Sequence, residues 1–425
     1  MKHLVLPLAL VGMLAVGCSE EKGPKGGEEN TPRHEIPTTR AERELIDANN
    51  EFAQKLMGKL AEGDSYADGN APANFVVSPL SLSMALSMTA TGAEGSTREE
   101  ILDVLGFDDL EAANALNRKL KESLPSMDNR TTVKLANAMW FENGTESNIR
   151  PEFSETLAAC YDATMNLVEG LGKENGMKLI NDWSATHTDY MIPRLLDQPL
   201  GDNTVMALTN ALYFKGKWTH EFSKEDTQTE RFYNLDGSTK DVDMMNARSM
   251  AVQAYEDKEA GYKAASLSYG NKAYSMIVVV PEFGRNPAEA LASIAPEDLA
   301  KLARRESNET NINLKLPCFT VENGTELIPA LRKLGIKEMF LPGCDFSAMW
   351  KVSDGDFLIS KVYQGAKICV DEQGAEAAAV TIITGECTSP GPVESTNFYV
   401  DRPFAFAIAE QSTGVILFAG VVTHL

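Results

Sequence analysis

Histidine is scarce in this sequence, and the motifs that mark common enzyme classes are absent. Only five histidines occur, and His3, His34 and His424 lie near the ends of the chain. No GxSxG elbow, HExxH helix or Walker-type phosphate-binding loop is present. The glycine-rich stretch 170–176 has the wrong spacing for a dinucleotide-binding turn and is typical of a surface loop. A hydrolase needs a positioned base, so we expect that the protein is not an enzyme.

Cysteine is also sparse and shows no metal-binding pattern. The six cysteines include no CxxC pair and have no zinc-type spacing. They are Cys18, Cys160, Cys318, Cys344, Cys369 and Cys387. Without Cys18 an odd number remains, so at least one thiol is expected to be free. The sequence therefore predicts no metal site, and it gives no basis for a cofactor.

Positive charge is under-represented as well. The chain has 39 Lys and Arg residues against 61 Asp and Glu residues, which gives a formal net charge of -22 at pH 7. An excess of negative charge repels the phosphates of nucleic acids and the headgroups of anionic lipids. We therefore expect no nucleic-acid partner and no electrostatic attraction to a membrane surface.

Residues 1–17 have the pattern of an export signal. Lys2 precedes an apolar stretch at residues 4–11, and the segment ends at Gly17. The apolar run is too short to span a membrane. Cys18 behind a small residue resembles the lipobox of bacterial lipoproteins, in which the cysteine is acylated and becomes the mature N-terminus. The alternative is an ordinary secretory peptide that is cut near Gly17.

The segment 18–41 is rich in Gly, Pro and Glu and cannot build a hydrophobic core, so we expect a flexible tether. The acidic residues after Cys18 resemble surface-export signals of bacterial lipoproteins. The N-terminal region thus predicts an exported protein that is anchored through a lipid on Cys18 in a bacterial cell envelope. A periplasmic and a surface-exposed or extracellular location are both consistent with this pattern.

The next part of the chain carries helical signals. Pro79 is expected near the first turn of a helix, because its missing N–H is harmless there. Ser96 and Glu99 resemble a capping box that would start another helix. The expected elements are a helix at 40–62, a buried strand at 75–77 and helices at about 81–89 and 98–105.

Strand signals dominate after residue 130. The segments are apolar and rich in β-branched or aromatic residues, and several are apolar on both faces, as central strands covered on both sides should be. They are 132–141, 205–214, 273–280, 312–321, 357–370 and 415–422. The predicted helices cluster in the first part of the chain and the predicted strands in the later part. This order predicts an α+β fold with a large mixed sheet.

One segment has conflicting local preferences. The alanine run 377–379 favours a helix, whereas the residues that follow it, Val380 to Thr384, favour a strand. A permanently packed helix does not explain the β-branched continuation. If Ala375 points inward in a strand, its inward neighbours 377, 379, 381 and 383 are all small or apolar, and the only charge in this run falls on the outer face.

At this point the sequence resembles the serpin family, from about residue 42 to residue 425. The matches include a strand and helix at 74–101, the motif LTNALYFKGKWTHEF at 208–222 and the segments 316–340 and 401–408, all in family order. The resemblance implies a serpin domain at 42–425 with three β-sheets and eight to nine helices. It also implies an exposed reactive-centre loop at about 372–400.

Serpins are suicide-substrate inhibitors, and the resemblance implies the same irreversible mechanism here. A target serine protease cuts the loop, remains attached as an acyl-enzyme in a covalent complex, and the loop inserts into the large sheet as a new strand. The inhibitor itself is expected to be a monomer. The residues that match the family's hinge, where insertion begins, are Glu372, Gly374, Ala375, Ala377, Ala378 and Ala379.

Other family positions control how the sheet opens. Residues matching the family's shutter and breach are Ser78, Ser81, Asn210, Trp218 and Gln364. Gln364 stands where many animal serpins have histidine, and its amide can still donate and accept hydrogen bonds. Cys318 stands where a lysine is expected to pair with Glu372, so that ion pair is absent.

Family spacing places the scissile bond at Thr388-Ser389, with Cys387-Thr388 as the next choice. No Lys or Arg occurs between Ile368 and Asp401, so a trypsin-like target would lack its cation. A small neutral residue suits elastase-like or subtilisin-like serine endopeptidases, whose primary pockets are shallow. Glu386 leaves a glutamate-specific protease as an alternative.

Two further alternatives stay open. One is inhibition of papain-like cysteine proteases, which also form acyl-enzymes. The other is a non-inhibitory serpin that acts as a binding protein, although the small-residue hinge argues against it.

Overall fold

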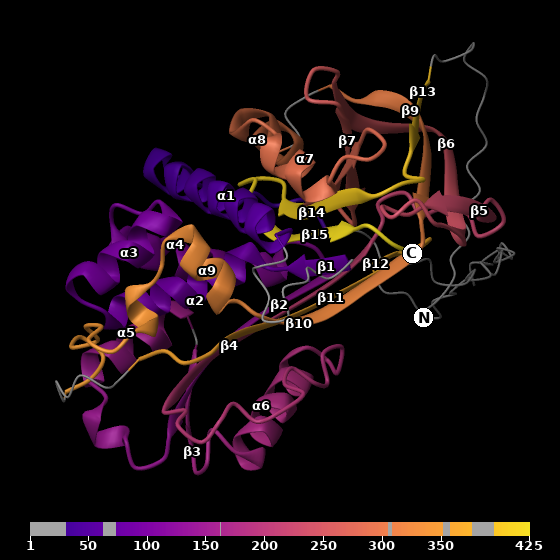
Figure 1. The fold of residues 1–425 in the computed structure, drawn as a ribbon. Coiled ribbons are helices and arrows are strands. Elements are labelled where there is room, and N and C mark those ends of the chain that lie inside the picture. The colour runs from indigo at the N-terminus through magenta and orange to yellow at the C-terminus, as the bar shows by residue number, and fades with distance from the viewer. Residues whose placement is uncertain (1–30, 63–73, 162, 305–307, 352–357, 376–394) are drawn as a thin grey trace, which may run out of the picture.

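The structure is a computed structural model, shown as a ribbon in Figure 1. It describes residues 31–62, 74–161, 163–304, 308–351, 358–375 and 395–425. Nine α-helices occur in these residues. They are α1 (Arg40–Leu60), α2 (Pro79–Gly92), α3 (Gly95–Leu105), α4 (Leu110–Ser123), α5 (Pro151–Tyr161), α6 (Glu174–His187), α7 (Pro287–Ser293), α8 (Pro296–Arg304) and α9 (Ile328–Leu334).

A six-stranded sheet runs through the lower half of the molecule in Figure 1. In spatial order its strands are β10 (Phe319–Glu326), β11 (Val362–Asp371), β12 (Gly374–Ala375), β4 (Met206–Lys217), β2 (Thr131–Glu142) and β3 (Thr164–Val168). The two-residue strand β12 lies between β11 and β4, which also pair directly with each other.

A second, nine-stranded sheet fills the upper half of the same view. Its strands in spatial order are β1 (Asn74–Val77), β15 (Ile416–Val422), β14 (Phe404–Glu410), β8 (Tyr274–Pro281), β7 (Tyr262–Tyr269), β6 (Thr239–Asp257), β9 (Thr310–Pro317) and β13 (Thr396–Tyr399), and β5 (Gln228–Tyr233) pairs with β6. The first part of β6 pairs with β5 and β9, whereas its last five residues pair with β7. The nine strands therefore form two sheets that share the long strand β6. One contains β1, β15, β14, β8 and β7, and the other contains β5, β9 and β13. With the six-stranded sheet this makes three, so the predicted α+β fold with three sheets and eight to nine helices is confirmed.

Helix α2 connects the two layers and is buried along almost its whole length. It contacts both β4 and β15. The side chain of Ser78 caps its first turn by accepting a hydrogen bond from the N–H of Ser81. The hydroxyl groups of Ser87 and Thr89 donate to backbone carbonyls one turn earlier, so these polar side chains are tolerated in the core.

The opposite face of the six-stranded sheet has its own smaller core. Alternate residues of β4 separate the two: Leu208 and Leu212 join the main core, whereas Ala207 and Ala211 join the small one. The small core is closed by α6, which Figure 1 shows on the other side of this sheet from α2. Period-2 alternation along a strand places neighbouring side chains on opposite faces in this way.

Most predicted elements are present, with some corrections. The segment 312–321, predicted as one strand, contains parts of β9 and β10, which are separated at Cys318. The helix expected at 81–89 extends over the full length of α2. The predicted capping box of Ser96 and Glu99 is wrong, because α3 starts at Gly95 and Ser96 donates instead to the carboxylate of Glu338.

The chain is already packed onto the body before helix α1. Thr39 and Glu42 form a capping box at the start of α1, so the helix begins at Arg40. Ile36 is buried, and its N–H donates to the Ser412 hydroxyl at 2.9 Å. The described part of the segment expected as a tether therefore contacts the domain. None of the described helices combines the length and the apolar character that crossing a membrane requires.

Candidate functional site

The candidate site is the gap between the neighbouring strands β4 and β11. These strands are parallel and pair directly over five positions, in which residues 208–212 face residues 362–366. Farther along, β12 lies between them and pairs with both. The two strands therefore enclose a gap with a closed end, at residues 208–212, and a hinge end, at β12.

Gly374 and Ala375 occupy the hinge end. The carboxylate of Asp371 accepts hydrogen bonds from the N–H of Gln373 at 2.9 Å and of Gly374 at 3.2 Å. This turn reverses the chain after β11 and returns it antiparallel to both β11 and β4. The side chain of Ala375 is only 1% exposed, so a charged or bulky side chain here would be buried without a partner.

Gly374 is required by its backbone conformation. Its φ angle is +147°, a value that residues with a side chain rarely adopt. A Cβ atom added at this position would overlap the backbone oxygen of Gly216 on β4. The hinge can enter between the two strands at this point because residue 374 has no side chain.

The segment that follows β4 holds the hinge by its backbone. The N–H of Trp218 donates to the carbonyl of Gln373 at 2.8 Å, and the N–H of Phe222 donates to the carbonyl of Glu372 at 2.8 Å. The indole N–H of Trp218 donates to the carbonyl of Asp371 at 2.9 Å. Its ring is buried and stacks on Tyr269, with centroids 4.3 Å apart. Trp218 is thus in direct contact with the segment that is predicted to begin the reactive loop.

The carboxylate of Glu372 has a partner other than the lysine that the family pattern provides. It accepts a hydrogen bond from the hydroxyl of Thr227 at 2.8 Å. Cys318 is close enough to respond electrostatically: burial, followed by the negative charges of Glu372 and Asp371, raises the pKa of the Cys318 thiol to about 12. This thiol therefore remains neutral at physiological pH. The contact between Thr227 and Glu372 was not predicted from the sequence.

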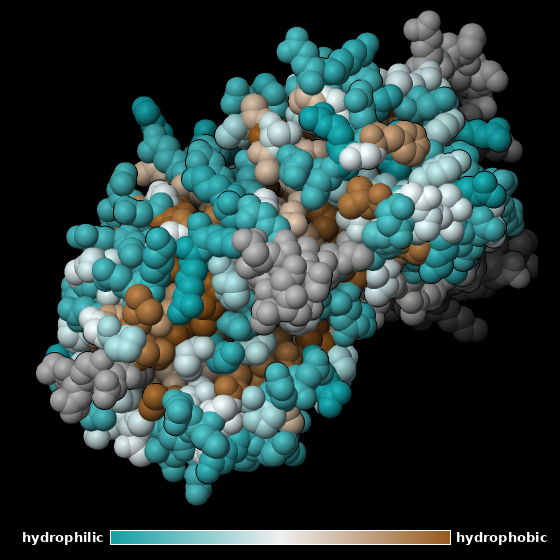
Figure 2. Space-filling model, viewed as in Figure 1, coloured by the Kyte–Doolittle hydropathy of each residue, from teal (hydrophilic) through white to brown (hydrophobic). Residues whose placement is uncertain are grey.

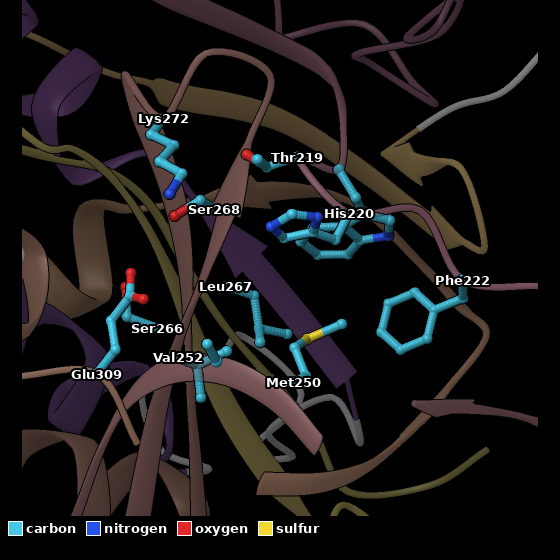
Figure 3. A pocket seen from close by; sticks show the side chains of 12 residues that line it. Thr219, His220, Phe222, Met250, Val252, Ser266, Leu267, Ser268, Lys272 and Glu309 are labelled. Atoms are coloured by element: carbon cyan, nitrogen blue, oxygen red, sulfur yellow. The ribbon is translucent and has the colours of Figure 1, made fainter. Parts of the chain in front are cut away.

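A small cavity of about 60 Å³ lies beside the hinge (Figure 3). Figure 3 shows Thr219, His220, Ser268 and Lys272 along one side, with apolar side chains opposite them. The lining consists of Trp218, Thr219, His220, Phe222, Met250, Ala251, Val252, Ser266, Leu267, Ser268, Lys272 and Glu309. The residues Trp218 and Phe222 that line this cavity also bind the hinge backbone.

The closed end is held by a network of buried side-chain amides. The side chain of Gln364 on β11 accepts from the N–H of Ser78 at 2.7 Å and donates to the Ser78 carbonyl at 2.9 Å. Its amide nitrogen also donates to the side-chain oxygen of Asn210 on β4 at 2.8 Å. Gln364 and Asn210 are direct partners in the β-ladder, so this bond must break when the strands separate.

The network extends to two further elements through Asn210. Its amide nitrogen contacts the hydroxyl of Ser81 on α2 and donates to the side-chain oxygen of Asn137 on β2 at 2.6 Å. The structure therefore brings together the four predicted shutter residues Ser78, Ser81, Asn210 and Gln364. Asn137 was missed, although a polar residue inside the apolar strand segment 132–141 was a usable signal.

A segment after α6 crosses the sheet over the closed end. The side chain of Asn181 in α6 accepts from the N–H groups of Leu195 and Leu196, both at 2.8 Å. Leu195 lies against Gly365 of β11, where an added Cβ would approach the leucine side chain to 2.8 Å. The small residue on β11 thus allows this segment, which we call the strap (residues 189–200), to lie flat on the sheet.

Several predicted site residues lie outside the described part of the chain. They are the hinge alanines Ala377, Ala378 and Ala379, the reactive-bond residues Cys387, Thr388 and Ser389, and Cys18. Within the described residues, no group of His, Cys, Asp and Glu side chains is arranged to hold a metal ion. The described residues of the site form a sheet with a gap between β4 and β11 that β12 occupies at one end and the bond between Gln364 and Asn210 closes at the other.

Comparison with known proteins adds independent information. A family model described as "Serpin (serine protease inhibitor)" matches residues 47–425. The chain is 32% identical over 384 residues to the leukocyte elastase inhibitor of Bos taurus, covering 89% of this chain and 98% of that protein. It is also 32% identical to Iripin-1 of Ixodes ricinus, covering 90% and 95% of the two chains.

Solved structures show the same architecture. The native state of tengpin, described as a thermophilic serpin, is similar with a TM-score of 0.80 and 26% sequence identity, and the match covers 93% of this chain and 97% of that one. The similarity extends over both sheets, because almost the whole chain is covered.

Proposed function

Because the chain belongs to the serpin family, we propose that it is an irreversible suicide-substrate inhibitor of serine proteases with shallow primary pockets, of the elastase or subtilisin type. The observation that carries this proposal is the position of Ala375, which is buried between β4 and β11 and paired with both. The first residues of the reactive loop already form a strand in the gap that the rest of the loop would fill.

The proposed covalent step uses the chemistry of the protease. Its active-site serine oxygen attacks the carbonyl carbon of Thr388, and the serine proton passes through the protease histidine to the departing amine of Ser389. The Thr388-Ser389 peptide bond breaks, and an ester bond joins Thr388 to the protease. Water would normally hydrolyse this ester, so arrest requires that the loop inserts first.

Insertion has a large driving force and a defined obstacle. A new central strand gains about a dozen ladder hydrogen bonds at roughly 0.5–1.5 kcal/mol each, or on the order of 10 kcal/mol in total. To admit it, the five paired positions between β4 and β11 must separate, together with the bond between Gln364 and Asn210. Cleavage releases the loop from its far end, and the hinge provides the place where separation begins.

The target class is inferred from the loop sequence and from the relatives. Without a Lys or Arg near the reactive bond, a protease with an acidic primary pocket would bury an unpaired charge. Inhibitors of leukocyte elastase are among the similar proteins. Both observations favour a protease that accepts a small neutral residue.

The proposal is tested by mixing the purified mature protein with pancreatic elastase, neutrophil elastase or subtilisin. We expect a band at the summed mass on a denaturing gel, and a released C-terminal fragment that begins at Ser389. Intact protein that is cut between residues 385 and 392 by all three proteases without arresting any of them would overturn the proposal. Arrest of papain alone would assign the protein to cysteine proteases.

A thermal measurement separates an inhibitor from a binding protein of the same fold. Insertion adds a strand to the six-stranded sheet, so the loop-cleaved protein should unfold at a much higher temperature than the intact protein. A cleaved protein that unfolds at the same temperature as the intact one would indicate a loop that does not insert.

We also propose that the protein is exported and anchored through a lipid on Cys18 to a bacterial cell envelope. The lipobox-like sequence at residues 15–18 supports this location. Metabolic labelling with a fatty acid is expected to label the wild type but not a Cys18→Ala variant, which should be recovered in the soluble fraction. A wild-type protein that is not labelled and begins at a residue other than Cys18 would contradict the anchor.

A further inference from the structure

Two large aromatic side chains are exposed and in contact with each other near the far end of the predicted reactive loop. The side chain of Phe283 is 60% exposed, and the ring of Tyr233 lies edge-on to it with centroids 5.8 Å apart. The guanidinium of Arg402 stacks over the Phe283 ring at 3.7 Å, and Tyr399 of β13 is also exposed. We call Tyr233, Phe283 and Arg402 the aromatic patch; Tyr399, three residues before Arg402, has its own partner, because the ammonium of Lys315 lies 5.2 Å from its ring.

The patch is fixed in place by its surroundings. Arg402 donates through Nε to the carboxylate of Asp401 at 2.8 Å, and the carbonyl of Asp401 accepts from the N–H of Tyr233. Single exposed hydrophobic residues are normal on protein surfaces, but a preorganised cluster of aromatic residues with an arginine is the composition of binding hot spots. In Figure 2, hydrophobic side chains interrupt the hydrophilic surface in the upper part of the molecule.

A groove of about 290 Å³ adjoins the patch and has balanced charge. Tyr399 and Arg402 belong to its lining, together with Phe398 and Pro281. The charged residues of the lining are Glu256, Asp257, Glu282, Lys258, Lys263 and Arg402. Three acidic and three basic side chains cancel locally, in contrast to the strongly negative chain as a whole. Unlike the strongly negative chain as a whole, this surface therefore does not repel a partner of either net charge.

The position of the patch near the predicted reactive bond favours the target protease as that partner. Tyr399 ends β13, the strand that begins at Thr396, seven residues after Ser389. Seven extended residues span at most about 25 Å. A protease domain of about 200 residues has a radius of gyration of about 16 Å, and so an outer radius of roughly 21 Å. A protease that holds the reactive bond must lie close to this end of the molecule.

We propose that the aromatic patch is a second docking surface for the body of the target protease, used in the complex that precedes cleavage. This inference rests on the proposed function. After cleavage the protease remains on Thr388 and is carried with it as the loop inserts between β4 and β11 of the six-stranded sheet, whereas the patch stays on the nine-stranded sheet. The patch should therefore affect how fast the protease is captured, but not the fraction of encounters that end in arrest or the stability of the final complex.

The test compares a Tyr233→Ala/Phe283→Ala double variant with wild type and with Leu341→Ala. Leu341 is 49% exposed and directly follows the short 3-10 helix Glu338–Phe340, which comes after α9 in the chain. Figure 1 shows α9 and β13 at opposite ends of the molecule. We expect the second-order rate constant of arrest to fall about tenfold in the double variant and to remain unchanged in Leu341→Ala. The stoichiometry of inhibition and the unfolding temperature should match wild type. Because the two substituted side chains are uncharged, the ratio of the two rate constants should be the same at 0.05 and 0.5 M NaCl.

The outcomes separate this inference from the proposed function. If wild type arrests one of the three proteases and the double variant arrests it equally fast, the docking surface is wrong while the inhibitor function stands. If wild type arrests none of them, the inhibitor function itself fails. Sedimentation tests whether a second copy of the protein binds the patch instead. If the wild type dimerises, the double variant does not, and both arrest the protease at the same rate, the patch is an interface between two copies.

Discussion

The two ends of the gap between β4 and β11 are held by different kinds of contact. At the hinge end, the main chain of residues 371–373 accepts hydrogen bonds from Trp218 and Phe222, and a two-residue strand pairs on both sides. At the closed end, the side-chain amides of Gln364 and Asn210 bind each other and the start of α2. Backbone contacts accept any small side chain, whereas an amide network requires particular residues.

This difference in contacts indicates that the two ends have different roles in the proposed insertion of the loop. In the proposed mechanism, the hinge end has to let a series of different residues pass, so the contacts there should restrict only the size and charge of the side chains. The closed end would have to separate once, and a small set of buried hydrogen bonds provides a barrier that is lost as a unit. Substitutions at the hinge end should therefore impair trapping of the protease, whereas substitutions at the closed end should lower the stability of the protein.

The largest effect is expected from Ala375→Glu at the hinge end. The new carboxylate would be buried between two strands without a partner, at a cost of several kcal/mol, so insertion should fail after cleavage. We expect the number of inhibitor molecules consumed per arrested protease to rise at least about tenfold. Gel analysis and titration of elastase measure this number. Ala375→Ser is the matched control and should remain close to wild type; a fully active Ala375→Glu variant would show that the hinge does not enter at this position.

At the closed end, Gln364→Ala should lower stability while leaving the hinge intact. The substitution leaves the N–H of Ser78 and the amide oxygen of Asn210 without their partner in a buried site. We expect the free energy of unfolding to fall by about 2–3 kcal/mol, measured by urea denaturation, and spontaneous opening of the sheet to accelerate on heating. Thr320→Ala, on the exposed side of β10, is the control and should change little. If the two variants were equally stable, the hydrogen-bond network would not be what holds β4 and β11 together at the closed end.

A smaller effect is expected in the strap that covers the closed end. Leu195 is buried in the small core below α6 and rests on Gly365. Leu195→Ala should lower the free energy of unfolding by about 2 kcal/mol, the lower end for a buried leucine, because this thin core can collapse around the cavity. Since the strap must move aside for a new strand, arrest should be at least as fast as in wild type, as stopped-flow measurements would reveal. Leu179→Ala on the exposed side of α6 is the control, and slower arrest in Leu195→Ala would mean that the strap assists insertion.

The smallest effect is expected from Cys318→Lys at the hinge end. The carboxylate of Glu372 already acts on this thiol, because its negative charge helps to raise the Cys318 pKa to about 12. A lysine would place a positive charge beside Glu372, but a partly exposed ion pair contributes only about 0–1 kcal/mol. We expect the rate of arrest to change less than about fivefold. Cys344→Lys, remote from the hinge, is the control; a much larger change in Cys318→Lys alone would show that Glu372 limits opening of the gap.

Motifs with fixed spacing made the closed end readable from the sequence. Ser78 follows a short strand and precedes Pro79, which is a local pattern for the start of a helix, and the structure shows this start. Asn210 lies within a long apolar strand, where a buried amide needs partners. The family resemblance grouped Ser81 and Gln364 with Asn210, but it did not indicate Asn137, because contacts between distant segments depend on the register of strands.

The hinge end was less predictable for a related reason. The small side chains at 374 and 375 indicated that a strand could form, but the two-residue strand β12 depends on the separation of β4 and β11, which no local pattern records.

Contacts between distant segments also explain two other differences from the predictions. The capping box expected at Ser96 is absent because Glu338, far away in the chain, accepts the hydrogen bond of the Ser96 hydroxyl. Likewise, the bond from Thr227 to Glu372 joins residues 145 positions apart.

The pairing of β1 with β15 has a consequence for how the molecule is made. Asn74, at the start of β1, accepts a hydrogen bond from the N–H of Thr423, 349 residues later in the chain. At 5–20 residues per second, a ribosome needs roughly 17–70 seconds to synthesise the intervening segment. Throughout that time β1 lacks its neighbour, and the upper sheet cannot close. The strands on both sides of the gap, β4 and β11, are therefore complete in sequence before β15, and any folding during synthesis has to proceed with β1 unpaired.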